Sequence, residues 1–248
     1  MTLTAIDPSR WTGMPIAPSS DTTSMNVLDA DSLSVSFDDA PVLHDASLLL
    51  RAGTSVSVVG SSGSGKSTLL HCLAGLRLPT SGSVSFDGQD IVQLSDRERS
   101  AIRLAKMGIV FQFGELVPEL SILENVALPA WLTGESRRSA NSAALTLLQA
   151  FGIEHTADRH PGRVSGGERQ RAAVARAIVH QPAVVFADEP TGSLDSDNAD
   201  RVIDTLLDET RQRGVALVLV THERRLAERA DVVVTMRDGR ITTHGSQP

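Results

Sequence analysis

Hydrophobic positions recur with different periods along this chain, and each period predicts a different kind of element. Short runs rich in β-branched and apolar residues predict strands in the first third, at residues 33–37, 42–50, 54–59 and 83–87. From about residue 112 to residue 180 the pattern is mostly helical, and Ser139–Phe151 is one such segment.

After residue 183 short apolar runs alternate with amphipathic segments. We expect helices at residues 197–213 and 222–229, and strands at residues 184–187, 215–220 and 231–236. Fully apolar strands that alternate with helices are typical of a parallel sheet covered on both faces. The pattern therefore predicts an α/β fold, and Asp238-Gly239 predicts a hairpin turn before a short tail.

The start of the chain differs in composition from the rest. Residues 1–24 are rich in Ser, Thr, Pro and Asp without periodicity, so we expect a disordered extension before one domain at residues 25–248. No apolar run approaches the ~20 residues that a membrane-spanning helix needs. The first residues also lack the apolar core of a signal peptide. We therefore expect no direct membrane insertion.

Charge and cysteine content narrow the possible partners. The net charge of −7 at pH 7 argues against nucleic acid or an anionic lipid surface as the main partner. Cys72 is the only cysteine, which rules out an intramolecular disulfide and fits a reducing compartment. Its position just after a glycine-rich segment favours core packing over reactivity.

The glycine-rich segment GSSGSGKS lies between an apolar strand and a predicted helix, the context in which G-x-x-x-x-G-K-[ST] binds a triphosphate. Its glycines let backbone N–H groups surround phosphate oxygens at a helix N-terminus. Lys66 adds a compact charge, and it is one of only two lysines beside 21 arginines. We expect a phosphate loop here rather than a flexible turn, and we expect the Ser67 hydroxyl to bind Mg²⁺. The residues of this loop are Gly60, Ser61, Ser62, Gly63, Ser64, Gly65, Lys66, Ser67 and Thr68.

A second segment, VVFADE at residues 184–189, ends in two carboxylates. Its apolar residues predict a buried strand whose carboxyl end delivers Asp188 to the edge of the sheet, where ligands bind. A carboxylate beside a triphosphate is suited to Mg²⁺, directly or through water. Glu189 can accept a proton from an attacking water, and a general base contributes about 10²–10⁴-fold in rate.

A third segment, VSGGERQ at residues 164–170, begins a predicted helix. Ser165 and Glu168 have the spacing of a capping box, which by itself explains a helix start. It does not explain Gly166 and Gly167, because glycine costs roughly 1 kcal/mol relative to alanine in a helix. A close backbone approach to an anion would explain them, yet one nucleotide in one monomer needs no second phosphate site.

Together these segments make the chain resemble the ATP-binding-cassette (ABC) ATPases over about residues 27–243. Six elements occur in that family's order: Gly60–Ser67, Gln112, Ser165–Gln170, Asp188-Glu189, Ser193-Leu194-Asp195 and His222. The resemblance implies a P-loop NTPase fold with a mixed-sheet core, an antiparallel β subdomain and a helical subdomain at about residues 113–180. It also implies ATP and Mg²⁺ as cofactors.

The resemblance further implies a head-to-tail homodimer in which each ATP lies between the phosphate loop of one subunit and the signature segment of the other. In that arrangement Asp195 would orient the facing subunit, Gln112 would touch Mg²⁺ and the attacking water, and His222 would hold the γ-phosphate. Without the other motifs, Asp195 would be read as a helix cap and Gln112 as a polar surface residue. His222 would be read as a histidine whose ring is hydrogen-bonded at a helix N-terminus. The signature residues implied to meet the γ-phosphate are Ser165, Gly166, Gly167 and Glu168.

The chain departs from the family's usual pattern at several positions. The adenine-stacking aromatic is commonly tyrosine, which this chain lacks, and Phe37 stands at that position, so we expect weak base discrimination. Val164 and Glu168 replace the usual Leu and Gln, and Glu168 is ordinary in one branch. Phe111–Pro118 and Leu123–Pro129 are similar to that branch, the ATPases of lipoprotein-release, macrolide-export and division-linked systems.

We therefore predict a cytoplasmic, membrane-peripheral ATPase subunit that powers conformational change in separately encoded integral membrane permease subunits. The Gln112–Pro118 loop and the Ser121–Trp131 helix are the expected docking groove. One alternative is a soluble ABC ATPase that remodels a non-membrane complex, but the chain lacks a coiled-coil insertion or a second cassette. A regulator without turnover is the other, and Glu189, Gln112 and His222 argue against it.

Overall fold

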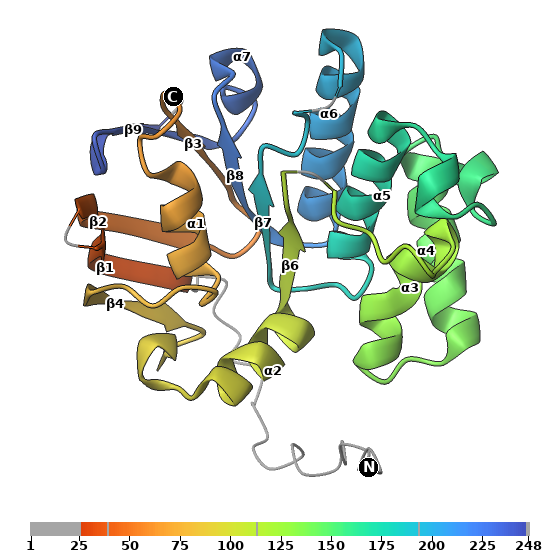
Figure 1. Ribbon diagram of the computed structural model, residues 1–248, viewed down its shortest axis with the longest axis horizontal. Helices are drawn as coiled ribbons and strands as arrows, with labels where there is room; N and C mark the ends of the chain where they lie inside the picture. Colours follow the sequence, from red (N-terminus) through yellow and green to blue (C-terminus); the bar gives the residue numbers. More distant parts are fainter. Residues whose placement is uncertain (1–25, 39, 113, 193, 247–248) are drawn as a thin grey trace.

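The computed structural model describes residues 26–38, 40–112, 114–192 and 194–246, so the predicted extension at residues 1–24 lies outside the described residues. Figure 1 shows an antiparallel sheet at one side, a central sheet, and a group of helices at the other side. Within the described ranges, no helix is long and apolar enough to cross a membrane.

The outer antiparallel sheet has the strand order β2-β1-β4-β5. Its register shifts between Ala30 and Leu33 in β1, where Ser32 takes a φ of 53°. Because this bulge adds a residue, Leu28 and Ala30 before it and Leu33 and Val35 after it all reach the core. The strands are β1 (Asn26–Phe37), β2 (Ala40–Arg51), β4 (Ser81–Phe86) and β5 (Gln89–Asp90).

The central sheet has the strand order β10-β9-β3-β8-β7-β6. Five of these strands are parallel and β10 pairs antiparallel with β9, which makes the sheet mixed. The strands are β3 (Ser55–Val59), β6 (Met107–Val110), β7 (Val184–Asp188), β8 (Ala216–Thr221), β9 (Val232–Arg237) and β10 (Arg240–Ser246).

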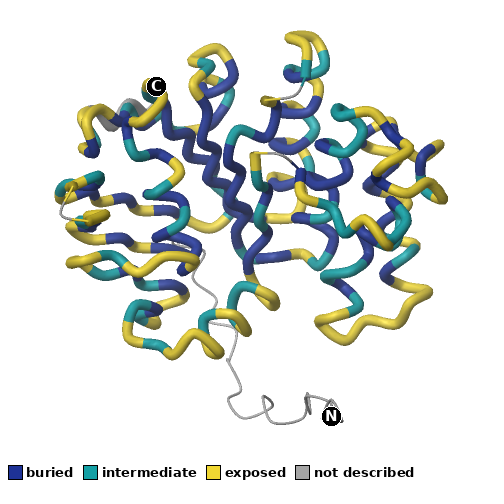
Figure 2. The backbone as a smooth tube through the Cα atoms, viewed as in Figure 1, coloured by how far each residue is buried: buried dark blue, intermediate teal, exposed yellow. Residues whose placement is uncertain are grey.

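The central strands are buried on both faces, as Figure 2 shows by their dark colour. In β7, Val184 and Phe186 join the core shared with α1 and the antiparallel sheet. Val185 and Ala187 point to the opposite face and join the core shared with α3 to α6. Alternate residues of β7 therefore pack into two different cores, as expected for a parallel sheet that is covered on both faces.

The helices cover both faces of the central sheet (Figure 1), and α1 contacts both sheets. The helices α3, α4 and α5 also pack against one another. The α-helices are α1 (Lys66–Leu73), α2 (Asp96–Lys106), α3 (Ile122–Leu132), α4 (Arg137–Ala150), α5 (Gly166–Ile178), α6 (Ser196–Gln212) and α7 (Arg224–Ala227). Short 3₁₀ helices are η2 (Ile91–Gln93), η3 (Glu154–Thr156) and η4 (Pro161–Arg163).

The mixed-sheet α/β fold predicted from the sequence is confirmed. The predicted tail after Asp238-Gly239 was wrong in part, because β10 follows that turn and pairs with β9. The helix expected from His222 begins two residues later, since Glu223 is its N-cap with extended backbone. The helix α2 was not predicted: it contains no fully buried residue, so it leaves no clear apolar stripe in the sequence.

Candidate functional site

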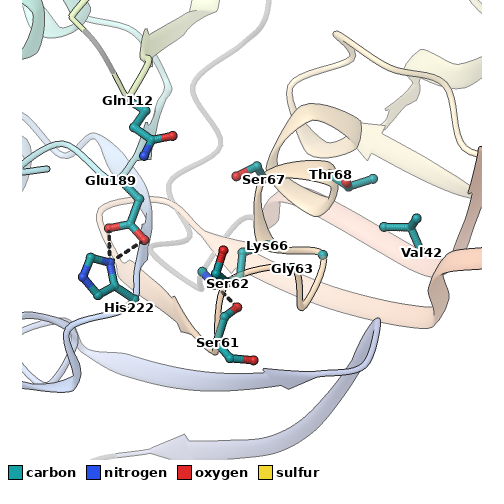
Figure 3. A pocket seen from close by; sticks show the side chains of 11 residues that line it. Val42, Ser61, Ser62, Gly63, Lys66, Ser67, Thr68, Gln112, Glu189 and His222 are labelled. Atoms are coloured by element: carbon teal, nitrogen blue, oxygen red, sulfur yellow. Dashed lines mark hydrogen bonds and ion pairs between the residues drawn. The ribbon is translucent and has the colours of Figure 1, made fainter.

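A cavity of about 680 Å³ lies at the carboxyl edge of the central sheet. Residues 61–63 and 65–68 form much of its wall, and the rest comes from distant parts of the chain. Gln112, Glu189 and His222 follow the neighbouring strands β6, β7 and β8, so the parallel sheet brings these three predicted residues to one place. Figure 3 shows them across the cavity from Ser67 and Thr68.

Close packing and backbone conformation explain why glycine stands at both ends of the phosphate loop. A Cβ on Gly60 would lie 2.3 Å from the Met236 carbonyl oxygen, so only glycine fits there. Gly65, the N-cap of α1, has a φ of 98°, in the left-handed region that favours glycine. These positions press the loop against β9 and direct the N-terminus of α1 into the cavity, where free N–H groups and the helix dipole favour anions.

The Lys66 ammonium lies inside the loop. Its Nζ donates to the carbonyl oxygens of Gly60 at 2.8 Å and Ser61 at 3.0 Å, and the residue is only 7% exposed. It forms no ion pair with any carboxylate in the described ranges. The hydroxyl of Ser64 is also buried without a hydrogen-bond partner there. A buried cation beside unused donors is an environment that a polyanion such as a phosphate chain would complete.

Asp188 tests whether the site fits a divalent cation. It is the last residue of β7, it is 6% exposed, and its Oδ1 has no hydrogen-bond partner in the described part of the chain. A buried, unpartnered carboxylate oxygen fits Mg²⁺ or one of its waters. No group of three or more His, Cys, Asp and Glu side chains forms a metal cluster among the described residues. The site therefore fits a cation that draws its other ligands from Ser67, water and phosphate.

Glu189 and His222 form a close pair. Nδ1 of His222 lies 3.0 Å from both carboxylate oxygens of Glu189, as the dashed lines in Figure 3 mark. Glu189 has a φ of 46°, a left-handed conformation that costs a non-glycine residue about 1–3 kcal/mol. Its N–H still donates to Val220 at 2.9 Å, so β8 holds the strained residue in place. Strain at this position aims the carboxylate into the cavity.

The signature segment does not line this cavity. Ser165 is the N-cap of α5, and its N–H and Oγ both donate to Glu168 Oε2, at 2.7 and 2.8 Å. These hydrogen bonds, and a further contact with His155, lower the pKa of Glu168 to about 2, so its carboxylate is ionised at neutral pH. The predicted capping box is therefore present, and the N-terminal end of α5 lies outside the cavity.

A contact within the same chain explains why residue 167 is glycine. A Cβ on Gly167 would lie 2.7 Å from Cδ2 of Leu194. Leu194 lies just before Asp195, the N-cap of α6, and Asp195 accepts from the Asn198 N–H at 2.9 Å. This cap, with a second bond from the Asn198 amide, lowers the pKa of Asp195. Ser193 lies outside the described residues.

Phe37 ends β1 and is 38% exposed. The guanidinium carbon of Arg77 lies 4.1 Å from the ring centroid and covers one face. Sequence reasoning missed Arg77, as it missed the cavity-lining Val42 of β2 and the contact of His155 with Glu168. No local pattern marks these contacts, because only tertiary packing brings each of these residues to its neighbour.

Comparisons with known proteins show which family the chain resembles. A profile of the ABC transporter family matches residues 43–192. The dimeric ATP-binding cassette MJ0796, solved in a post-hydrolysis state bound to ADP and Pi, is 32% identical, with a TM-score of 0.83. That match covers 88% of this chain and 98% of MJ0796.

A second dimeric structure of MJ0796, described as a bacterial ABC transporter cassette, matches equally well. The protein cbiO1 from Clostridium perfringens, described as part of the ABC transporter complex cbiONQ, is 26% identical with a TM-score of 0.78. This match covers 89% of the present chain and 88% of cbiO1. The protein whose sequence is given above is thus an ATPase that uses ATP with Mg²⁺, and it belongs to the ABC transporter family.

Proposed function

We propose that this chain is the ATP-hydrolysing subunit of an ABC transporter or mechanotransmission complex, working on separately encoded membrane subunits. The observation that carries the proposal is the single cavity that joins the phosphate loop to Gln112, Glu189 and His222. A phosphate loop alone would suit many nucleotide-binding proteins. A carboxylate and an imidazole held opposite it provide the groups needed for turnover.

The binding half of the site consists of residues 60–68, with Lys66 as the buried charge. When bound, Mg²⁺ would neutralise the developing charge on the phosphate oxygens. Ser67, Gln112 and Asp188 would hold that ion or its waters, and the unpartnered Oδ1 of Asp188 supports this role. Phe37 at the end of β1 would stack on the base, since an exposed aromatic ring offers it a face.

The hydrolytic half consists of Glu189 and His222. Glu189 would accept the proton of the attacking water, and Gln112 would orient that water for in-line displacement. His222 fixes the Glu189 carboxylate through Nδ1, which leaves Nε2 free to face the γ-phosphate. Positioning and charge stabilisation would supply most of the rate, because phosphoryl transfer needs little covalent chemistry from the protein.

A homodimer would complete the site. The signature residues Ser165, Gly166, Gly167 and Glu168 form a capped helix end that lies outside the cavity of one chain. Placed against the cavity of a second copy, this end would bring donors to the γ-phosphate, and Asp195 would orient the facing subunit. The dimeric structures of MJ0796 support the proposal of a homodimer.

The membrane partner would be an integral permease subunit, with this chain peripheral on the cytoplasmic face and without a nucleic-acid partner. The Gln112–Pro118 loop beside α3 is the proposed docking site. Asn125 of α3 binds both the N–H and the carbonyl of Val117, at 2.7 and 3.0 Å, so the end of this loop is tied to α3. Membership of cbiO1 in a transporter complex supports the proposal. Within the family, the segments around Gln112 and Leu123 favour the lipoprotein-release and macrolide-export group.

Two measurements test this function. Phosphate release at saturating MgATP should be abolished in Glu189→Gln, while ATP binding remains and an ATP-bound dimer accumulates. Asp208→Asn, at an exposed carboxylate of α6, is the matched control and should hydrolyse ATP normally. Normal turnover by Glu189→Gln would show that another group is the base. Co-purification of the tagged chain with soluble proteins alone, and no membrane protein, would favour a soluble remodelling ATPase instead.

A further inference from the structure

Glu168 has a third partner beyond its capping box. While Oε2 accepts both hydrogen bonds from Ser165, Oε1 lies 2.9 Å from Nε2 of His155. His155 belongs to η3, 13 residues earlier in the chain. The Glu168 side chain is 16% exposed and that of His155 is 53% exposed. Both carboxylate oxygens are therefore occupied, which fixes the plane of the carboxylate as well as its position.

The orientation of Ser165 depends on that carboxylate. The Ser165 hydroxyl donates to Glu168 Oε2, and the Glu168 N–H donates back to Ser165 Oγ at 3.2 Å. If Oε1 faced only water, the carboxylate would be free to rotate and to exchange its two oxygens. A bond from His155 to an ionised acceptor is stronger than one between neutral groups, and it removes this freedom.

The turn that carries His155 is itself tied to the start of α3. Thr156 is buried, and its Oγ1 donates to the Ile153 carbonyl at 2.6 Å. Just beyond, the carbonyls of Ala157 and Arg159 accept the N–H groups of Leu123 at 2.9 Å and Ile122 at 2.8 Å. His155 therefore joins α5 to a segment held by the N-terminal turn of α3, the helix beside the proposed docking loop.

We propose that His155 is a positioning residue for the signature end of α5: by holding Glu168 it orients Ser165 toward the nucleotide in a second subunit. The inference rests on the proposed function, because the signature end meets nucleotide only in the homodimer. His155 does not line the cavity, so it acts through Glu168 and leaves the nucleotide affinity of one subunit unchanged.

The test compares His155→Ala, His155→Phe and His155→Gln in the full chain, with His160→Ala as the matched control. His160 is a nearby exposed histidine whose side chain makes no capping bond at η4. Loss of one hydrogen bond should lower kcat about 2- to 10-fold in the alanine and phenylalanine variants. The KM for ATP and the binding of a fluorescent ATP analogue to the isolated subunit should not change. Glutamine, whose side-chain N–H can donate to Glu168, should restore kcat.

Several results would overturn the inference. A wild-type kcat in His155→Ala, or an equal loss in His160→Ala, would remove the special role of His155. A loss that glutamine fails to restore and that follows a matching fall in Tm would assign His155 to fold stability instead. If the unmodified chain itself releases no phosphate, the proposed function fails. This outcome differs from an active chain whose kcat does not change when His155 is replaced.

Discussion

Gly167→Ala separates two explanations for the paired glycines of the signature segment. One is a close approach of the backbone to a phosphate, and the other is packing within the chain. The structure gives the second explanation a specific contact, because the added Cβ would lie 2.7 Å from Cδ2 of Leu194. Ordinary van der Waals contact begins at about 3.4 Å, so Leu194 or the start of α5 would have to move by several tenths of an ångström.

The two effects on stability have opposite signs. Alanine gains up to about 1 kcal/mol over glycine from helix propensity, and less in the first turn, where Gly167 lies. Overpacking costs about 1–3 kcal/mol. We therefore expect Gly167→Ala to lower the free energy of unfolding by about 0–3 kcal/mol. In the Leu194→Ala background the clash is gone, and the same substitution should be neutral or stabilising.

The assay is a double-mutant cycle read by urea unfolding and by phosphate release at saturating MgATP. The cycle should give a coupling free energy of about 1–3 kcal/mol between Gly167 and Leu194, because the two side chains meet directly. If a close approach to the nucleotide of the second subunit also requires glycine, turnover should stay low in the double variant even though its stability recovers. Full recovery of both quantities would show that packing against Leu194 is the whole reason for the glycine.

Three further outcomes follow from burial and exposure. Burial raises the pKa of Cys72 to about 11, so a thiol reagent at pH 8 should not label the native chain and should label one thiol after unfolding. Phe37→Ala should weaken ATP binding about 5- to 100-fold by nucleotide titration, while Phe37→Tyr should not. Phe186→Ala should cost about 3–5 kcal/mol in urea unfolding, since its ring is fully buried, and a cost below about 1 kcal/mol would contradict the assigned core.

The central sheet and the position of its cavity could be predicted because short segments of the sequence are enough to indicate the strands. In β7 and β8 every residue is buried, so an unbroken apolar run is all that the sequence needs to contain. A parallel sheet then places the residues that follow its strands at one edge without further information. Glu189 and His222 could be placed at one edge of the sheet for this reason, although they lie 33 positions apart in the sequence.

Other features depend on packing that no short pattern encodes. The early part of β1 was missed because the bulge at Ser32 breaks the period of two, and Asp45 in β2 also has a left-handed φ, of 53°. The pair His155–Glu168 and the contact of Gly167 with Leu194 join segments that only the tertiary fold brings together. The glycines illustrate the limit well, because the sequence suggested only an anion as their cause.

The segment from Asp188 to Asp195 connects the proposed hydrolytic residues with the signature segment of the same chain. It begins with the candidate metal ligand and the candidate base, and it ends with Leu194 against Gly167 and with the cap of α6. Two backbone bonds tie it into consecutive turns, from Gly192 to Glu189 at 3.1 Å and from Leu194 to Thr191 at 2.9 Å. Because Glu189 already has a left-handed φ, a shift of Leu194 at its contact with Gly167 should change the backbone of Glu189 and so the direction of its carboxylate. We expect the position of the signature end and the orientation of the proposed base to be linked through this short segment, without a long-range pathway.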